Sequence, residues 1–173
     1  MKRTLTVAGV VAVVPALSVT AFAVQASSAS SKQRAVAASA VVHRDVISLS
    51  AAQKLASAAQ AECAKRGIAV SVAVVDTDGV DILLQRADGT TGATVAVARG
   101  KARAAAGFQS PTAALNEAAK TTPGLISVPD FVILPGGEPI MVGKTLIGGV
   151  GVSGAPSGDI DDACAQAGLA AIA

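Results

Sequence analysis

Aromatic side chains are almost absent from this chain of 173 residues, which contains three Phe and no Tyr or Trp. Stacked aromatic rings are the usual platform for single-stranded nucleic acid, so no such platform is expected here. The 14 basic residues nearly balance the 12 acidic ones, and the basic residues form no stripe. Nucleic acid is therefore not a predicted partner, and the core must be built from Val, Ile, Leu and Ala.

Histidine is scarce as well, since His43 is the only one in the chain. A metal centre held by several histidines is therefore excluded. A Ser-His-Asp triad would have to draw His43 from the segment before the first expected helix. Paired glutamates are also lacking in the sequence, so no acid–base constellation indicates an enzyme.

The N-terminus combines the features of a secretory signal peptide. Lys2 and Arg3 follow the initiator methionine. Residues 5–24 are almost continuously apolar, and small residues near position 26 fit a cleavage site. We therefore expect a signal peptide at 1–26 and a secreted, extracellular protein without membrane contact after cleavage. The alternative is a retained membrane anchor, because the apolar run nearly reaches the ~20 residues of a spanning helix.

The rest of the chain is predicted to form a tether and one domain. Residues 27–46 begin as a Ser/Ala/Gln-rich stretch without hydrophobic periodicity, which is typical of a flexible tether. Residues 47–173 are long enough for a single domain with its own hydrophobic core.

Periodicity and turn residues predict that this domain is antiparallel α+β, because short hairpins rather than strand–helix crossovers connect its strands. Either Ser48 or Ser50 is expected to cap the first helix. The expected helices are 51–65, 92–108, 111–119 and 160–171, and the five expected strands are 68–75, 80–85, 131–134, 140–142 and 145–152.

Glycine is concentrated in the last quarter of the chain. Four of the nine residues from 146 to 154 are glycine, although the segment has the apolar character of a strand. Glycine gives up packing and backbone entropy in a strand, so something must need to approach this backbone closely. A ligand and a neighbouring subunit are the two interpretations. The carboxylates that follow, Asp159, Asp161 and Asp162, suit the positive end of the last expected helix.

Five stretches of the chain, in the same order, resemble the GlcG/HbpS family of small haem-binding proteins. The matching stretches are 74–79 with 82–89, then 98–105, 110–112, 135–140 and 146–162. The resemblance implies a five-stranded antiparallel sheet of profilin-like architecture flanked by helices. It also implies an assembly of identical chains.

The same resemblance implies a haem site after the second expected helix. Thr112 matches a threonine that haem-binding members of the family use, and Phe108 would contribute apolar burial of the porphyrin. Three cations, Arg99, Lys101 and Arg103, would pair with the haem propionates. The alternative for Thr112 is a hydroxyl that bonds locally in the first turn of a helix.

His43 is the second residue considered as a ligand of the haem iron. A neutral imidazole is a good axial ligand, whereas a lone histidine ahead of the first helix is also typical of a solvated side chain.

The two cysteines, Cys63 and Cys164, fall on core-facing positions of the first and last expected helices. The resemblance implies that these helices pack side by side, which would allow a disulfide between them. An exported pair is disposed to oxidise. Two inert buried thiols are the alternative.

The chain is therefore expected to be a secreted, oligomeric haem-binding protein. Its role would be that of a carrier, a scavenger or an extracellular signalling accessory whose partner is a cell-surface sensor protein. One alternative is a small enzyme acting on haem or an organic acid, which the lack of an acid–base constellation disfavours. The other is a ligand-free oligomeric scaffold, which the scarcity of aromatic residues favours.

Overall fold

The computed structural model describes residues 38–173. The compact unit that carries the fold runs from Val42 to Ala173. The predicted signal peptide at 1–26, and the predicted tether up to residue 37, lie outside the described residues. Within the part that is described, no helix is long and apolar enough to cross a membrane.

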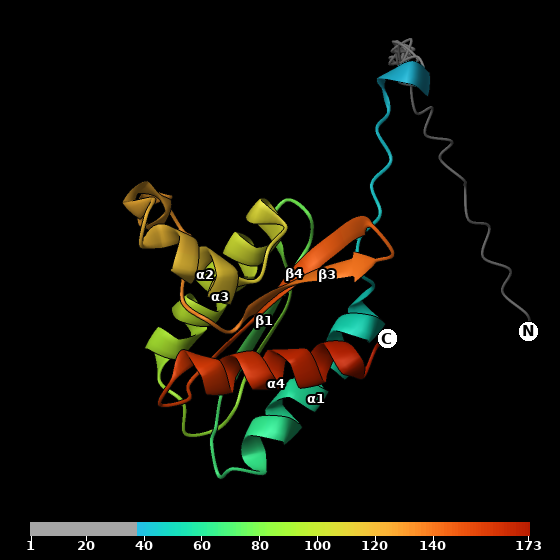
Figure 1. Ribbon diagram of the computed structural model, residues 1–173. Coiled ribbons are helices and arrows are strands. Elements are labelled where there is room, and N and C mark those ends of the chain that lie inside the picture. Colours follow the sequence, from blue (N-terminus) through green and yellow to red (C-terminus); the bar gives the residue numbers. More distant parts are fainter. Residues whose placement is uncertain (1–37) are drawn as a thin grey trace, which may run out of the picture. The chain divides into compact units, whose positions relative to one another are not determined.

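The unit contains four α-helices, one short 3₁₀ helix and four strands among its described residues (Figure 1). In chain order these are α1 (Leu49–Ala64), β1 (Ser71–Val75), β2 (Asp81–Arg86), α2 (Gly92–Phe108), α3 (Thr112–Ala119), η2 (Pro123–Ser127), β3 (Gly137–Val142), β4 (Thr145–Ser153) and α4 (Gly158–Ala170). A further 3₁₀ turn, η1 (Ala38–Ala40), lies before the unit. The α+β class and the order of helices and hairpins agree with the sequence prediction.

The sheet has four strands in the order β2-β1-β4-β3, and every neighbouring pair is antiparallel. The predicted fifth strand at 131–134 is wrong, because helices rather than a strand bind its backbone. Val132 N–H donates to the carbonyl of Gly100 in α2, and the carbonyl of Ile133 accepts from the side-chain amide of Asn116 in α3.

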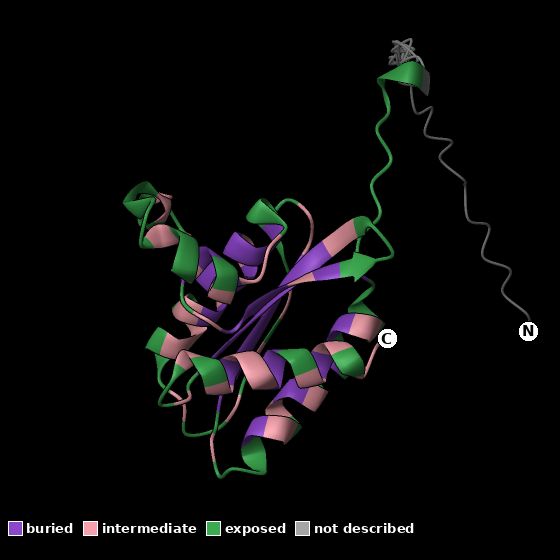
Figure 2. Ribbon diagram, in the orientation of Figure 1, coloured by how far each residue is buried: buried purple, intermediate pink, exposed green. Residues whose placement is uncertain are grey.

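Helices cover both faces of the sheet, so the domain has three layers (Figure 1). Val72 and Val74 of β1 pack into the core beneath α1 and α4. Ala73 and Val75 alternate with them and pack against α2 on the other face. This explains why β1 is buried along its whole length, as the central purple strands in Figure 2 show.

Local sequence signals define the first helix as predicted. Ser48 is the residue that caps α1, since its hydroxyl accepts from the N–H of Ala51 at 3.2 Å. After the helix ends, Gly67 adopts a φ of 69°, which costs glycine nothing.

The glycines of β4 are explained by helix α2 of the same chain. A Cβ at Gly149 would meet the carbonyl oxygen of Ala102, and a Cβ at Gly151 would meet that of Ala98 and lie 2.6 Å from the N of Ala102. The backbone of α2 therefore lies directly on β4. The two interpretations offered from sequence, a ligand and a neighbouring subunit, are both unnecessary for these two positions.

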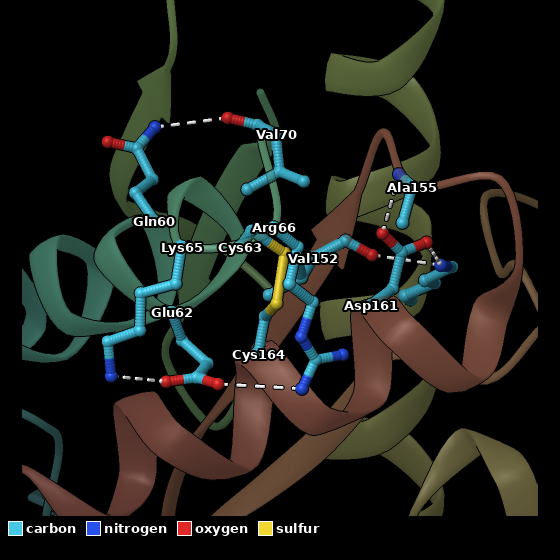
Figure 3. Close-up of a disulfide and its surroundings, with 11 residues drawn as sticks. Gln60, Glu62, Cys63, Lys65, Arg66, Val70, Val152, Ala155, Asp161 and Cys164 are labelled. Carbon is cyan, nitrogen blue, oxygen red and sulfur yellow. Dashed lines mark hydrogen bonds and ion pairs between the residues drawn. A yellow bond between two sulfur atoms is a disulfide. The ribbon is translucent and has the colours of Figure 1, made fainter. Parts of the chain in front are cut away.

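The last helix is attached to the first by a disulfide. Cys63 of α1 and Cys164 of α4 are fully buried and joined through their sulfur atoms (Figure 3). The two helices lie side by side on one face of the sheet (Figure 1). The predicted disulfide is therefore present, and it closes a loop with a sequence separation of 101.

The contact between α2 and β4 predicts the effect of one added methyl group. Gly151→Ala should lower the free energy of unfolding by about 1–3 kcal/mol or more, because neither the helix nor the strand can move away alone. Gly124→Ala is the control, since no atom lies within 4 Å of its Cβ position, and it should change stability by less than about 0.5 kcal/mol. Urea unfolding measures both values, and equal stability of the two variants would contradict the close contact.

The disulfide predicts a second stability difference. Replacing both cysteines by alanine should lower the free energy of unfolding by about 4–5 kcal/mol, because the unfolded chain loses a long covalent loop. Denaturant unfolding with and without reductant measures this. Reductant should destabilise the parent protein and leave the double variant unchanged, and an unaffected parent would overturn the expectation.

Candidate functional site

The three cations that the sequence proposed for a ligand lie in three different environments. Lys101 is only 2% exposed, and its Nζ donates to the carboxylate of Asp161 at 2.7 Å and to the carbonyl of Val152 at 2.8 Å. Figure 3 shows Asp161 between Val152 and Ala155, whose N–H donates to the second carboxylate oxygen at 3.0 Å. The ammonium group of Lys101 therefore forms its ion pair and its hydrogen bond to the backbone inside the fold.

Burial acts on both members of this pair. It lowers the pKa of Lys101 and raises the pKa of Asp161, while the attraction between the two charges acts in the opposite direction for each. Gly136 makes the pair possible, because a Cβ there would lie 2.7 Å from the Cβ of Asp161 and 2.8 Å from the Nζ of Lys101. Asp161 is therefore a structural ion-pair partner as well as a residue of the first turn of α4.

Arg99 already has a carboxylate partner. Its guanidinium contacts Asp81 of β2 at 2.7 Å, and both side chains are about one-third exposed, at 32% each. The hydrogen bond to Asp81 raises the pKa of Arg99 further. This cation is therefore neutralised in the free protein.

Arg103 differs from the other two. Its Nε donates to the carbonyl of Gly79 at 3.0 Å, and no carboxylate among residues 38–173 lies within ion-pair distance of its guanidinium. The bond to Gly79 orients the side chain and leaves its two terminal nitrogens for a ligand.

A cleft of about 590 Å³ adjoins Arg103. This volume is in the range of small-molecule sites. The cleft lies between the β1–β2 turn, α2 and the loop before β3. Its lining consists of Thr77, Asp78, Gly79, Val80, Asp81, Arg103, Gly107, Pro129, Asp130 and Phe131.

Two of the three phenylalanines pack against each other, and one of them lines this cleft. Phe131 lines it, and Phe108 at the end of α2 packs edge-to-face against Phe131 with 5.6 Å between ring centroids. Gly107 gives the ring room, because a Cβ there would lie 2.8 Å from the Cζ of Phe131. Phe108 remains 37% exposed. Phe131 therefore contributes an aromatic ring to the cleft that Arg103 also lines, and Phe108 packs against this ring.

The sequence interpretation did not single out Phe131, Thr77 or Asp130. Their signal in the sequence is weak, because the turn and the loop that carry them meet only in the folded chain. In contrast, the sequence alone indicates that the three cations do not share one face of the helix. Arg99 and Arg103 are four residues apart and share a helix face, whereas Lys101 lies on the opposite side.

The proposed iron ligands lie outside the lining of this cleft. Thr112 is fully buried. Its hydroxyl accepts from the N–H of Gly137 at 2.8 Å and donates to the carbonyl of the same residue at 3.3 Å. His43 lines a neighbouring hollow of about 480 Å³, which shares Thr77 and Asp78 with the cleft.

A further titratable group is buried on the edge strand β3. Glu138 of β3 is 8% exposed, and burial followed by the charge of Asp162 raises its pKa to about 7. Asp162 itself accepts from the N–H of Gly136 at 3.1 Å and from the side-chain amide of Gln166 at 2.8 Å. None of these residues lines the Arg103 cleft.

The fold defines a small α+β domain with a cleft beside helix α2. A family model described as haem degrading protein HbpS-like matches residues 47–170. The chain belongs to this HbpS-like family, which confirms the resemblance identified in the sequence.

Solved structures agree with this assignment. A double mutant of Streptomyces reticuli HbpS is 36% identical, with a TM-score of 0.76, over 79% of this chain and 93% of that one. A PduOC:heme complex is 27% identical, with a TM-score of 0.68, over 73% of this chain and 94% of that one. In sequence, a 15.0 kDa protein from the dhaT-dhaS intergenic region of Citrobacter freundii is 31% identical over 113 residues, which are 62% of this chain and 80% of that protein.

The environment of Glu138 predicts a pH dependence of stability. Its pKa rises from an ordinary value of 4.5 to about 7 on folding, so the folded protein keeps a proton that the unfolded chain releases between these two values. Stability should therefore fall by at most about 3 kcal/mol as the pH rises through this interval. Glu138→Gln should remove this part of the decrease and be more stable than the parent at pH 8. Urea unfolding at a series of pH values measures it, and parallel profiles for the two proteins would contradict the assignment.

Proposed function

We propose that this protein binds haem in the cleft beside Arg103. The observation that carries the proposal is an arginine without a carboxylate partner among the described residues, in a cleft of about 590 Å³ that Phe131 also lines. Membership of a family whose description names haem supports the same ligand, as does the likeness to a PduOC:heme complex.

The chemistry of the cleft suits an amphipathic ring that carries carboxylates. Phe131 and Phe108 would contact the apolar porphyrin. Arg103 would pair with a propionate, and Arg99 could join it by exchanging Asp81 for the ligand. A hollow of about 320 Å³ that shares Arg103 and Phe131 with the cleft reaches Arg99.

The iron ligand is proposed to be His43 or Thr112. His43 requires the shorter rearrangement, because its hollow adjoins the cleft through Thr77 and Asp78. Thr112 would have to release Gly137, and a hydroxyl is a weak ligand for iron. Haem affinity would then rest mainly on apolar burial and on the arginine.

The proposed place of action is outside the cell. The predicted signal peptide and the buried disulfide between α1 and α4 both suit an oxidising compartment. We propose a carrier, scavenger or signalling accessory that assembles with identical chains and addresses a cell-surface sensor. Exposed apolar residues near the edge strand β3, among them Val46, Met141 and Val142, suit such an assembly.

A haemin titration followed by visible absorbance tests the haem proposal. The purified protein should show saturable binding, and Arg103→Gln should weaken it about tenfold or more because a charge-assisted contact is lost. Arg66→Gln is the matched control, since Arg66 pairs with Glu62 on the exposed surface of α1 and should leave affinity unchanged.

Two further variants identify the iron ligand in the same titration. A shift of the Soret band in His43→Ala or in Thr112→Ala, with binding retained, would assign the ligand. Size-exclusion chromatography with detection at haem wavelengths reports the assembly that carries the haem. Absence of saturable binding in the parent protein would refute the haem proposal, and steady loss of the bound spectrum would indicate haem degradation instead.

A further inference from the structure

One buried hydroxyl beside the cleft has no hydrogen-bond partner. Among the described side chains, the Oγ1 of Thr77 is the only buried nitrogen or oxygen atom without one. Within the β1–β2 turn, the N–H groups of Asp78 and Val80 donate to the carboxylate of Asp76 rather than to Thr77. An unpaired buried polar atom costs stability, so its presence calls for an explanation.

Thr77 and Arg103 lie on the same cleft and are connected through the turn. Both line it, and the Nε of Arg103 is bound to the carbonyl of Gly79, two residues after Thr77. The turn therefore places Thr77 and the guanidinium of Arg103 on one cleft. A hydroxyl beside an arginine is a donor set that suits a carboxylate.

We propose that Thr77 and Arg103 together bind a carboxylate group of the ligand. Arg103 contributes its terminal nitrogens. Thr77 contributes its hydroxyl after a rotation about the Cα–Cβ bond, because Oγ1 is shielded in the free protein and needs another staggered rotamer to reach the cleft. The rotation exchanges an unpaired hydroxyl for a paired one, so binding removes the cost that the free protein carries.

The charges around the cleft suit one carboxylate next to Arg103. Two of its three aspartates are neutralised, since Asp78 pairs with Arg44 and Asp81 pairs with Arg99. Asp130 has no ion-pair partner among the described residues, and it adopts a φ of 63°, in the left-handed region that Asp and Asn enter more readily than other non-glycine residues. Asp130 therefore opposes a second negative charge near its own side chain, so any further carboxylate of a ligand should lie away from it.

The carboxylate has two chemical sources, and both are tested. One is a haem propionate, and this arm rests on the proposed haem function. The other is a free organic acid, for which succinate is the probe. Haemin and its dimethyl ester, in which the propionates carry no charge, form the first comparison. Succinate and its dimethyl ester form the second, followed by NMR shifts of the amides from Thr77 to Val80.

The variants separate binding from folding. Thr77→Val keeps the shape of the side chain and removes only the hydroxyl. It should weaken binding of the acid forms about tenfold while leaving the free protein as stable as the parent or more so. Thr77→Ser, the control, should retain affinity. Asp130→Asn tolerates the same backbone conformation and should strengthen carboxylate binding about two- to threefold.

The outcomes distinguish the two proposals. Preference for the acid over the ester, lost in Thr77→Val and in Arg103→Gln, supports the carboxylate site. If succinate shows this pattern and haemin does not bind, the carboxylate site stands and the haem function fails. If haemin and its ester bind equally and succinate does not bind, the haem function stands and the carboxylate site is overturned. Unchanged acid affinity in Thr77→Val also overturns the role of Thr77.

Discussion

The direct contact between the backbone of α2 and the glycines of β4 is the constraint on which the rest of the structure depends. Gly149 and Gly151 have no Cβ, so the carbonyls of Ala102 and Ala98 lie directly on the strand. At this short distance, the side of α2 next to the sheet accepts small residues and one long side chain, Lys101. The opposite side of the helix then carries Arg103 to Gly79 in the β1–β2 turn and Arg99 to Asp81 at the start of β2.

Two buried connections attach α4 to this arrangement. The disulfide joins α4 to α1, and the pair of Lys101 with Asp161 joins it to α2 through the end of β4. A buried ion pair adds little net stability, because desolvation offsets the attraction. Its hydrogen bonds are directional, however, and so they specify where α4 begins. The disulfide contributes stability and the ion pair contributes position.

The cleft follows from the same geometry. The segment before β3 is held by Gly100 and Asn116 of the helices instead of pairing as a strand. This places Phe131 beside α2, where Gly107 leaves space for its ring. Arg103 is held by Gly79 on the other side. The site is thus built from three parts of the chain, which are the β1–β2 turn, α2 and the segment before β3.

Local patterns in the sequence determined the helices, the hairpins, a serine cap at Ser48 or Ser50 and the α+β class, because these depend on neighbours a few residues apart. The family resemblance added the pairing of Cys63 with Cys164. Tertiary structure alone decided that the segment 131–134 is no strand, that β4 needs its glycines for α2, and that Lys101 has a buried carboxylate partner whereas Arg103 has none among the described residues. The physical reason is that each of these outcomes depends on which backbone or carboxylate from a distant part of the chain lies next to the residue. Packing between the layers decides this, and local sequence patterns do not.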